Sequence, residues 1–126
     1  MQQEQAALTG AAAGRKFEID VLAFFCVAMP AEVVRTVGEL DENFGTGFFE
    51  DDDYCRRVRA SGRRLVCAED VFVHHELSAS FARVDASARR ELFERNRAYF
   101  ESKWGPWKQH TYRTDGKGRA GESAAG

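Results

Sequence analysis

Apolar positions along the chain fall into short continuous runs and into stripes with helical spacing. FEIDVLAFFCVAM at residues 17–29 is rich in β-branched and aromatic residues and almost continuously apolar, which is typical of a strand covered on both faces. Pro30 fits the first position of a helix, AEVVRTV at residues 31–37 predicts that helix, and Gly38 supplies a left-handed stop. A second helix is predicted to start at the FFEDDD segment and to end at Gly62.

The rest of the chain predicts two short strands and one long helix. RRLVC at residues 63–67 and VFVHH at residues 71–75 have the composition of strands, and AED separates them. Residues 86–104 form the longest periodic segment, with core-facing positions at intervals of three and four and charges on the opposite side. The core-facing positions are Leu92, Phe93, Asn96, Tyr99, Phe100 and Trp104. This order predicts an α/β domain with a small mixed sheet flanked by helices.

The two ends of the chain differ in composition from the part between them. Residues 1–16 are rich in Ala, Gln and Gly without periodicity, and residues 113–126 are too polar and glycine-rich to pack, so both are predicted to be flexible. The folded domain is expected at residues 17–112. With 126 residues and 44% hydrophobic content, the chain can bury a modest core.

Charge, cysteines and hydropathy narrow the classes of protein. The chain has 18 basic and 20 acidic residues and a net charge of -2, so no nucleic-acid partner is predicted. Cys26, Cys55 and Cys67 lack the CxxC spacing of a zinc ribbon and predict a reducing, cytoplasmic setting. The longest apolar run, VLAFFCVAMP at residues 21–30, is well short of the ~20 residues of a transmembrane helix.

The second predicted helix opens with four carboxylates, Glu50, Asp51, Asp52 and Asp53. Ordinary capping explains such a turn, because carboxylates there meet unpaired backbone N–H groups and the positive end of the helix dipole. Asp52 or Asp53 can in addition pair with Arg56 or Arg57. The four charges also repel one another, which raises the proton affinity of at least one carboxylate, as a general base or a metal site requires.

Helical phase distinguishes Asp51 from its neighbours. At ~100° per residue Asp51 shares a face with the predicted buried stripe, so it points inward, whereas Asp52 and Asp53 diverge from that stripe toward a solvated edge. The stripe consists of Tyr54, Cys55 and Val58. An inward carboxylate beside an aromatic, glycine-bounded loop suits proton abstraction from an alcohol.

Histidines and serines give weaker signals. His74 and His75 end the strand predicted at 71–75, so their side chains point to opposite faces and cannot both bind one metal ion without distortion. A single histidine there fits a structural hydrogen bond as well as a metal ligand. Ser78 and Ser80 lack a Gly-x-Ser-x-Gly elbow, which argues against a serine hydrolase.

Three stretches together carry a family resemblance: DVLAFFCVAMPAEVVRTVGELDENF, GFFEDDDYCRRVRASGRRLVCAEDVFVHH and ELFERNRAYFESKWG. Their order resembles the C-terminal half of a GT-A-fold, family-two inverting nucleotide-sugar glycosyltransferase, over most of residues 17–112. The EDDD segment is the specific part, because it is similar to the G-x-G-x-E-D-D-D motif of related galactosyltransferases. The resemblance implies that Asp51 is the catalytic base and that Glu50 binds the acceptor hydroxyl. Gly47, Phe48 and Phe49 would form part of the acceptor wall.

The resemblance also implies a metal ion and substrates. His74, with His75 as the fallback, would help to hold Mg²⁺ or Mn²⁺ at the diphosphate of a nucleotide-sugar donor. Asp52, Asp53 and Arg56 would have supporting roles. The acceptor would be a glycan or a lipid-linked or protein acceptor.

The family's nucleotide-binding half, with its D-x-D metal motif, is not among the 126 residues. The sequence therefore predicts a transferase portion that is inactive without that half, which would come from a longer chain or from a second chain. Two alternatives stay open: a non-catalytic interaction module that binds a partner at its sheet edge, and a small metal-binding protein that uses the carboxylates with His74 or His75.

Overall fold

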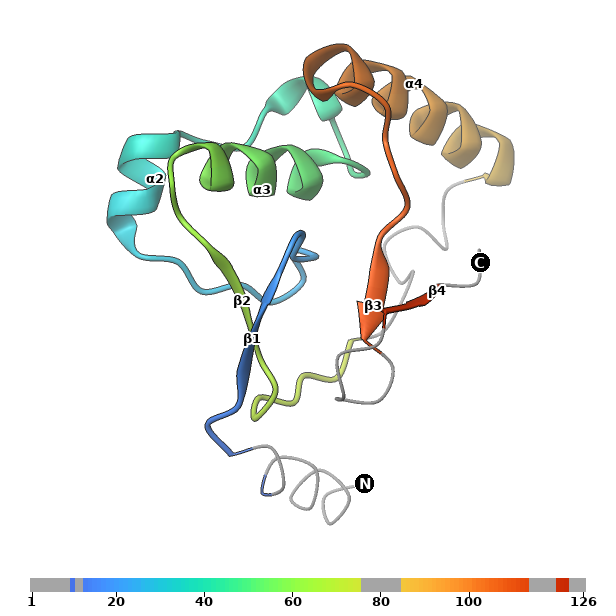
Figure 1. Ribbon diagram of the computed structural model, residues 1–126. Helices are drawn as coiled ribbons and strands as arrows, with labels where there is room; N and C mark the ends of the chain where they lie inside the picture. The colour runs from blue at the N-terminus through green and yellow to red at the C-terminus, as the bar shows by residue number, and fades with distance from the viewer. Residues whose placement is uncertain (1–9, 11–12, 76–84, 114–119, 123–126) are drawn as a thin grey trace.

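The computed structural model describes residues 10, 13–75, 85–113 and 120–122 (Figure 1). In chain order these residues form β1 (Lys16–Ile19), α2 (Ala31–Val37), the 3-10 helix η1 (Glu42–Phe44), α3 (Glu50–Ala60), β2 (Leu65–Ala68), α4 (Ala86–Trp104), β3 (Thr111–Arg113) and β4 (Ala120–Glu122). The coarse prediction of a mixed α/β architecture is confirmed. Most of the segments expected to be flexible, 1–16 and 113–126, lie outside the described residues, but Ala120–Glu122 pairs as a strand with Thr111–Arg113.

Sheet structure is smaller than the sequence predicts. β1 and β2 pair antiparallel, with Lys16 opposite Ala68 and Ile19 opposite Leu65, and this ladder ends where β2 begins. The strand expected over residues 17–29 therefore stops at Ile19, because no second described strand lies beside residues 20–29 to bond their backbone groups. The strand expected at 71–75 is also absent, and those five residues are exposed and irregular.

Residues 20–29 are nevertheless tied to α3. The backbone N–H of Leu22 donates to Cys55 Sγ at 3.3 Å, and the thiol donates back to the Leu22 carbonyl at 3.6 Å. Burial is the main reason that the pKa of Cys55 rises to about 11, so its thiol stays protonated at neutral pH. The apolar residues that predicted a strand here pack against the core instead. Val21, Leu22 and Phe24 lie against the cluster that contains Cys55.

The predicted helices agree closely with the structure. α2 has Pro30 as its N-cap, one residue earlier than predicted, and ends at Gly38, which has φ 88°. α3 ends at Ala60, just before Gly62. α4 covers the predicted residues 86–104, with the Asp85 side chain accepting from the backbone N–H groups of the first turn.

α3 lies between two apolar clusters, with α2 on one side of it and α4 on the other (Figure 1). The first cluster joins α3 to α2 and β2 and contains Val33, Tyr54, Cys55, Val58 and Leu65. The second joins the start of α3 to α4 and contains Phe44, Phe49 and Phe100. The loop at residues 45–49 therefore sits where α3 meets α4.

Asn96 of α4 holds that loop in a strained conformation. Its side-chain amide, which is fully buried, lies within donating distance of three carbonyl oxygens, those of Phe44 at 2.7 Å, Gly47 at 2.6 Å and Phe48 at 3.1 Å. Phe48 and Phe49 both have positive φ, 65° and 73°, which is unusual for bulky residues. The amide thus stabilises a backbone path that the phenylalanines alone would disfavour.

We predict that Asn96→Ala lowers the free energy of unfolding by about 2–4 kcal/mol, because it removes the bonds from a buried amide to the carbonyls of Gly47 and Phe48 and leaves only Arg95 on that of Phe44. Asn96→Asp, which presents an acceptor to the same carbonyls, should cost more. Urea unfolding followed by circular dichroism measures both. Glu94→Ala on the exposed side of the same helix is the control and should change stability by no more than about 0.5 kcal/mol. An Asn96→Ala protein as stable as this control would contradict the assigned role.

Candidate functional site

The four consecutive carboxylates lie in the first turn of α3, as predicted, and they have different surroundings. Glu50, Asp51 and Asp52 are half-buried, whereas Asp53 has 0% of its surface exposed. The prediction that Asp53 lies on a solvated edge is therefore wrong. Helical phase showed only that Asp53 diverges from the stripe at 54, 55 and 58. It did not include α4, whose Lys103 and Trp104 cover this side chain.

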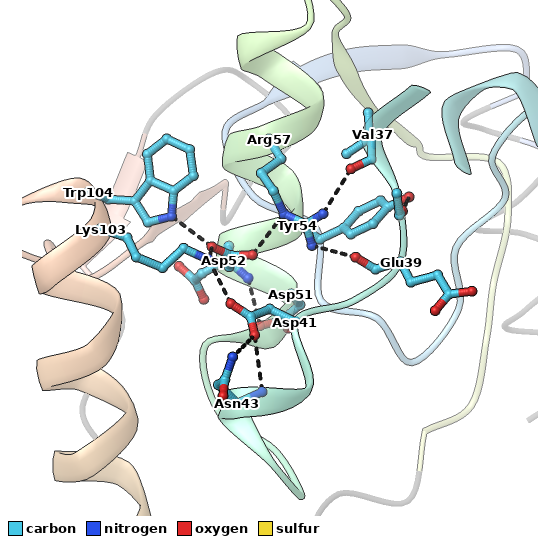
Figure 2. Close-up of polar contacts among 12 residues, drawn as sticks. Val37, Glu39, Asp41, Asn43, Asp51, Asp52, Tyr54, Arg57, Lys103 and Trp104 are labelled. Carbon is cyan, nitrogen blue, oxygen red and sulfur yellow. Dashed lines mark hydrogen bonds and ion pairs between the residues drawn. The ribbon is translucent and has the colours of Figure 1, made fainter. Parts of the chain in front are cut away.

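Asp53 accepts from cations and an indole on two helices. Arg57, one turn further along α3, donates from Nε to Asp53 Oδ2 at 2.9 Å. From α4, Lys103 Nζ lies 2.6 Å and Trp104 Nε1 2.9 Å from Asp53 Oδ1. Figure 2 shows the side chain of Arg57 on α3 and the side chains of Lys103 and Trp104 on α4. A charge this deeply buried is tolerated only when it is paired and hydrogen-bonded, and this one is both.

The same network reaches the segment before η1. Lys103 Nζ also lies 2.8 Å from Asp41 Oδ2, and the Tyr99 hydroxyl donates to that oxygen at 2.9 Å. The Lys103 ammonium is the largest reason that the pKa of Asp41 lies far below its usual range. Burial opposes the charge of Lys103, but its bonds to the two aspartates raise its pKa overall.

Asp51 lies at a pocket of about 230 Å³ on the side of α3 that faces residues 20–23. The lining residues are Val21, Ala23, Phe48, Phe49, Glu50, Asp51, Asp52, Phe93, Trp107 and His110. Burial is the largest cause that raises the pKa of Asp51 to about 6, and the charges of Asp52 and Glu50 add to it. The repulsion argument from the sequence therefore holds for this carboxylate, which is the property that a general base near neutral pH needs.

His110 belongs to the pocket and was not foreseen from the sequence. Its Nε2 atom lies 2.7 Å from Asp52 Oδ1. This hydrogen bond is the main cause that raises the pKa of His110, in opposition to burial. The available signal was the run GPWKQH after the helix stop at Gly105, because a tryptophan and a histidine are unusual in a segment that merely leaves a helix.

Of the residues predicted to form the acceptor wall, some line the pocket and one does not. Phe48 and Phe49 line the pocket, and their rings lie 5.5 Å and 5.1 Å from that of Phe93. Glu50 also lines it, and its Oε2 atom is buried. Gly47 is not among the lining residues, and its carbonyl instead accepts from Asn96. Arg56, predicted to support the site, is exposed, and Arg57 is the residue that pairs with Asp53.

His74 and His75 do not join the carboxylates. Both are exposed, neither lines the pocket, and the His75 ring stacks on Phe25 with centroids 4.6 Å apart. Among the described residues no group of three His, Cys, Asp or Glu side chains is arranged to hold a metal ion. The strand that was expected to place His74 is not formed, and the described residues around this histidine do not make a metal site by themselves.

Comparisons with known proteins find a partial similarity. No protein-family model matches the chain, and no solved structure matches it. The chain is 33% identical over 79 residues to the uncharacterized protein y4gI of Sinorhizobium fredii. That alignment covers 63% of this chain and 9% of y4gI, so the chain spans less than a tenth of its relative. Within the described residues, the helices are too short or too polar to cross a membrane.

We predict that Asp51→Asn stabilises the protein at neutral pH. Because the folded-state pKa is about 6 against an ordinary 3.8, folding binds a proton between these values, and wild-type stability falls as pH rises through them. The loss is complete above pH ~6 and amounts to about 3 kcal/mol. Urea unfolding from pH 4 to 8 should show the variant gaining this difference progressively. Asp85→Asn at the N-cap of α4 should give a flat difference over the same range, since the pKa of Asp85 is lowered.

We also predict that Asp52→Asn lowers the pKa of His110, because it removes the hydrogen bond that chiefly raises it. The stabilisation from this pair is fully present below the ordinary histidine pKa of 6.5 and disappears as pH rises through the higher folded-state value. Titration of the His110 imidazole proton by NMR measures the shift. Asp51→Asn is the matched comparison and should lower the same pKa less, since Asp51 acts only through its charge.

Proposed function

We propose that this chain is the acceptor-and-base portion of an inverting nucleotide-sugar glycosyltransferase with a GT-A fold, working in the cytoplasm, and that Asp51 is its general base. The observation that carries this proposal is the Asp51 carboxylate at an aromatic pocket, with its pKa raised to about 6. Such a group is ionised at neutral pH and still binds a proton far more readily than an ordinary aspartate, which suits it to accept one during a reaction.

In the proposed reaction an acceptor hydroxyl in the pocket donates its proton to Asp51 as its oxygen attacks the anomeric carbon of the donor sugar. The new C–O bond forms while the bond from that carbon to the nucleoside diphosphate breaks on the opposite face, so the configuration inverts. Phe48 and Phe49, just before α3, line the pocket and place apolar surface beside the carboxylate. Asp52, held by His110, keeps a second charge beside the base.

The proposal requires a nucleotide-binding half from outside the residues discussed here. The relative y4gI supports this requirement, because a segment similar to this chain makes up only 9% of it. In the complete enzyme Mg²⁺ or Mn²⁺ would be held by the D-x-D motif of that half, with His74, or His75 in its place, as the further ligand that the resemblance assigns. The donor would be a nucleotide sugar and the acceptor a glycan or a lipid-linked or protein hydroxyl.

A non-catalytic interaction module is the second candidate, and the exposed apolar side chains favour it. Large apolar residues that are at least 36% exposed lie mostly between α2 and β1 or after β2: Phe25, Met29, Val34, Leu40, Val66, Val71, Phe72 and Val73. Apolar surface of this extent commonly marks a contact with another protein segment. A nucleotide-binding half would also cover such residues, so the two candidates differ in turnover and not in whether these side chains have a partner.

Turnover of the complete polypeptide from the native gene tests the proposal. We expect release of UDP or GDP from a panel of nucleotide sugars in the presence of a glycan acceptor and Mn²⁺. Asp51→Asn should reduce the rate about 10²- to 10⁴-fold, the usual contribution of a general base. Asp85→Asn is the matched control, because asparagine also caps helices well, and it should leave the rate unchanged.

Because Asp51→Asn is expected to stabilise the fold, its loss of turnover would not reflect unfolding. Equal rates for wild type and Asp51→Asn would refute the role of Asp51. If the wild-type protein turns over no donor in the panel, the interaction module becomes the better description.

A further inference from the structure

Two buried polar atoms in the Asp51 pocket have no hydrogen-bond partner among the described residues. They are Oε2 of Glu50 and Nε1 of Trp107, and both residues line the pocket. Leaving such an atom buried and unpaired costs about 1–3 kcal/mol, so a native protein rarely keeps two of them in one pocket without a use. Their presence together points to a ligand that supplies the missing bonds.

The two atoms have complementary requirements. A carboxylate oxygen can only accept a hydrogen bond, and an indole N–H can only donate one. A hydroxyl group does both, so a molecule with one or more hydroxyls satisfies the pair. An ammonium ion would suit the carboxylates, but it has no lone pair to offer the indole N–H.

Trp107 is held in place by contacts outside the pocket. Its backbone N–H donates to Glu101 Oε1 at 3.0 Å, and the guanidinium carbon of Arg97 lies 5.8 Å from the centre of its ring. Glu101 is itself fixed by Arg97 at 3.1 Å. The indole is therefore positioned before any ligand arrives, and binding would not have to order it.

The walls and the size of the pocket limit the ligand further. The Trp107 ring packs edge to face with Phe49 at 5.4 Å and with Phe93 at 6.1 Å, so aromatic carbon surrounds the polar atoms. This mixture of aromatic surface and a few hydrogen-bonding groups matches the apolar C–H faces and hydroxyl rim of a sugar ring. A volume of about 230 Å³ is below the ~300 Å³ at which typical ligand pockets begin, which suits one ring.

We propose that Glu50 and Trp107 bind a hydroxyl of a single neutral sugar ring, and that Trp107 thereby determines which acceptor the site takes. This inference rests on the proposed function, because the ring would be the acceptor whose neighbouring hydroxyl meets Asp51. Trp107 is not part of the resemblance on which that function was based. It is a specificity residue, and Asp51 remains the base.

NMR of the full 126-residue chain tests the binding directly, because each tryptophan gives its own indole N–H signal. We expect methyl glycosides of glucose, galactose and N-acetylglucosamine, titrated one by one, to include at least one that shifts the Trp107 signal saturably. The Trp104 signal is an internal control and should stay in place, since its N–H already donates to Asp53 at 2.9 Å. Tetramethylammonium at the same concentrations should leave both signals unmoved.

Variants separate the hydrogen bonds from the ring. Trp107→Phe keeps an aromatic ring and removes the donor, and Glu50→Gln weakens the acceptor, so each should reduce glycoside affinity at least fivefold, as measured by calorimetry. Glu91→Gln, on an exposed position of α4, should bind like wild type. A response to tetramethylammonium in place of the glycosides, or no glycoside response, would overturn the inference.

The inference and the proposed function can fail separately. Saturable glycoside binding without any turnover of nucleotide sugars would leave the sugar-binding role of Glu50 and Trp107 standing, and would refute the transferase together with the acceptor role of the bound ring. Turnover with unchanged KM for the acceptor in Trp107→Phe would leave the transferase standing and refute the role of Trp107.

Discussion

A carboxylate with none of its surface exposed must have cationic or hydrogen-bonding partners, and Asp53 obtains them from two helices. Lys103 and Trp104 belong to α4, and Arg57 belongs to α3 itself. Arg57 also donates to the backbone carbonyls of Val37 and Glu39, at 3.0 Å and 2.8 Å, so the end of α2 joins the same network (Figure 2). Any rotation of α3 would separate Asp53 from Lys103 and Trp104, and Arg57 from the carbonyls of Val37 and Glu39. These contacts therefore fix the direction in which the rest of the acidic turn points.

Fixing α3 in this way gives adjacent residues of identical charge different chemistry. Asp53 is neutralised by its cations, Asp52 is paired with His110, and Asp51 has neighbouring negative charge without a cation of its own. Burial and this neighbouring charge are what raise the pKa of Asp51. The four consecutive carboxylates therefore lie in different environments. Two of the aspartates have cationic partners, and the third, Asp51, is the one whose pKa is raised.

Local sequence patterns predicted the helices well. Proline, glycine and aspartate at their ends, and the spacing of Phe93, Asn96 and Phe100, are signals carried within about four residues of each position, so the bounds of α4 followed directly. The strands failed for the opposite reason. Continuous apolar character at 17–29 shows that the segment is to be covered, but pairing depends on a neighbour that local composition does not specify.

The candidate site was likewise predictable only where its residues are close together in the sequence. Asp51, Glu50 and the phenylalanines are contiguous, so helical phase placed them together. His110 and Trp107 reach the pocket only because α4 folds back over α3, and the burial of Asp53 has the same cause. The assignment of His74 depended on a strand at 71–75 that the structure does not contain. Contacts between residues more than fifty positions apart are the part that a single sequence did not supply.

The loop at residues 45–49 makes the site more sensitive to insertions and deletions than to many substitutions. Its path is set by Asn96 and by two residues with positive φ, and it determines which residue becomes the first of α3. Removing one residue there would force one of two changes. Either α3 turns by ~100°, which separates Asp53 from α4 and places a different aspartate at the pocket, or the loop leaves the path that Asn96 holds. Homologues that keep an aspartate at this pocket should therefore differ in the residue types at positions 45–49 and keep the same number of residues there.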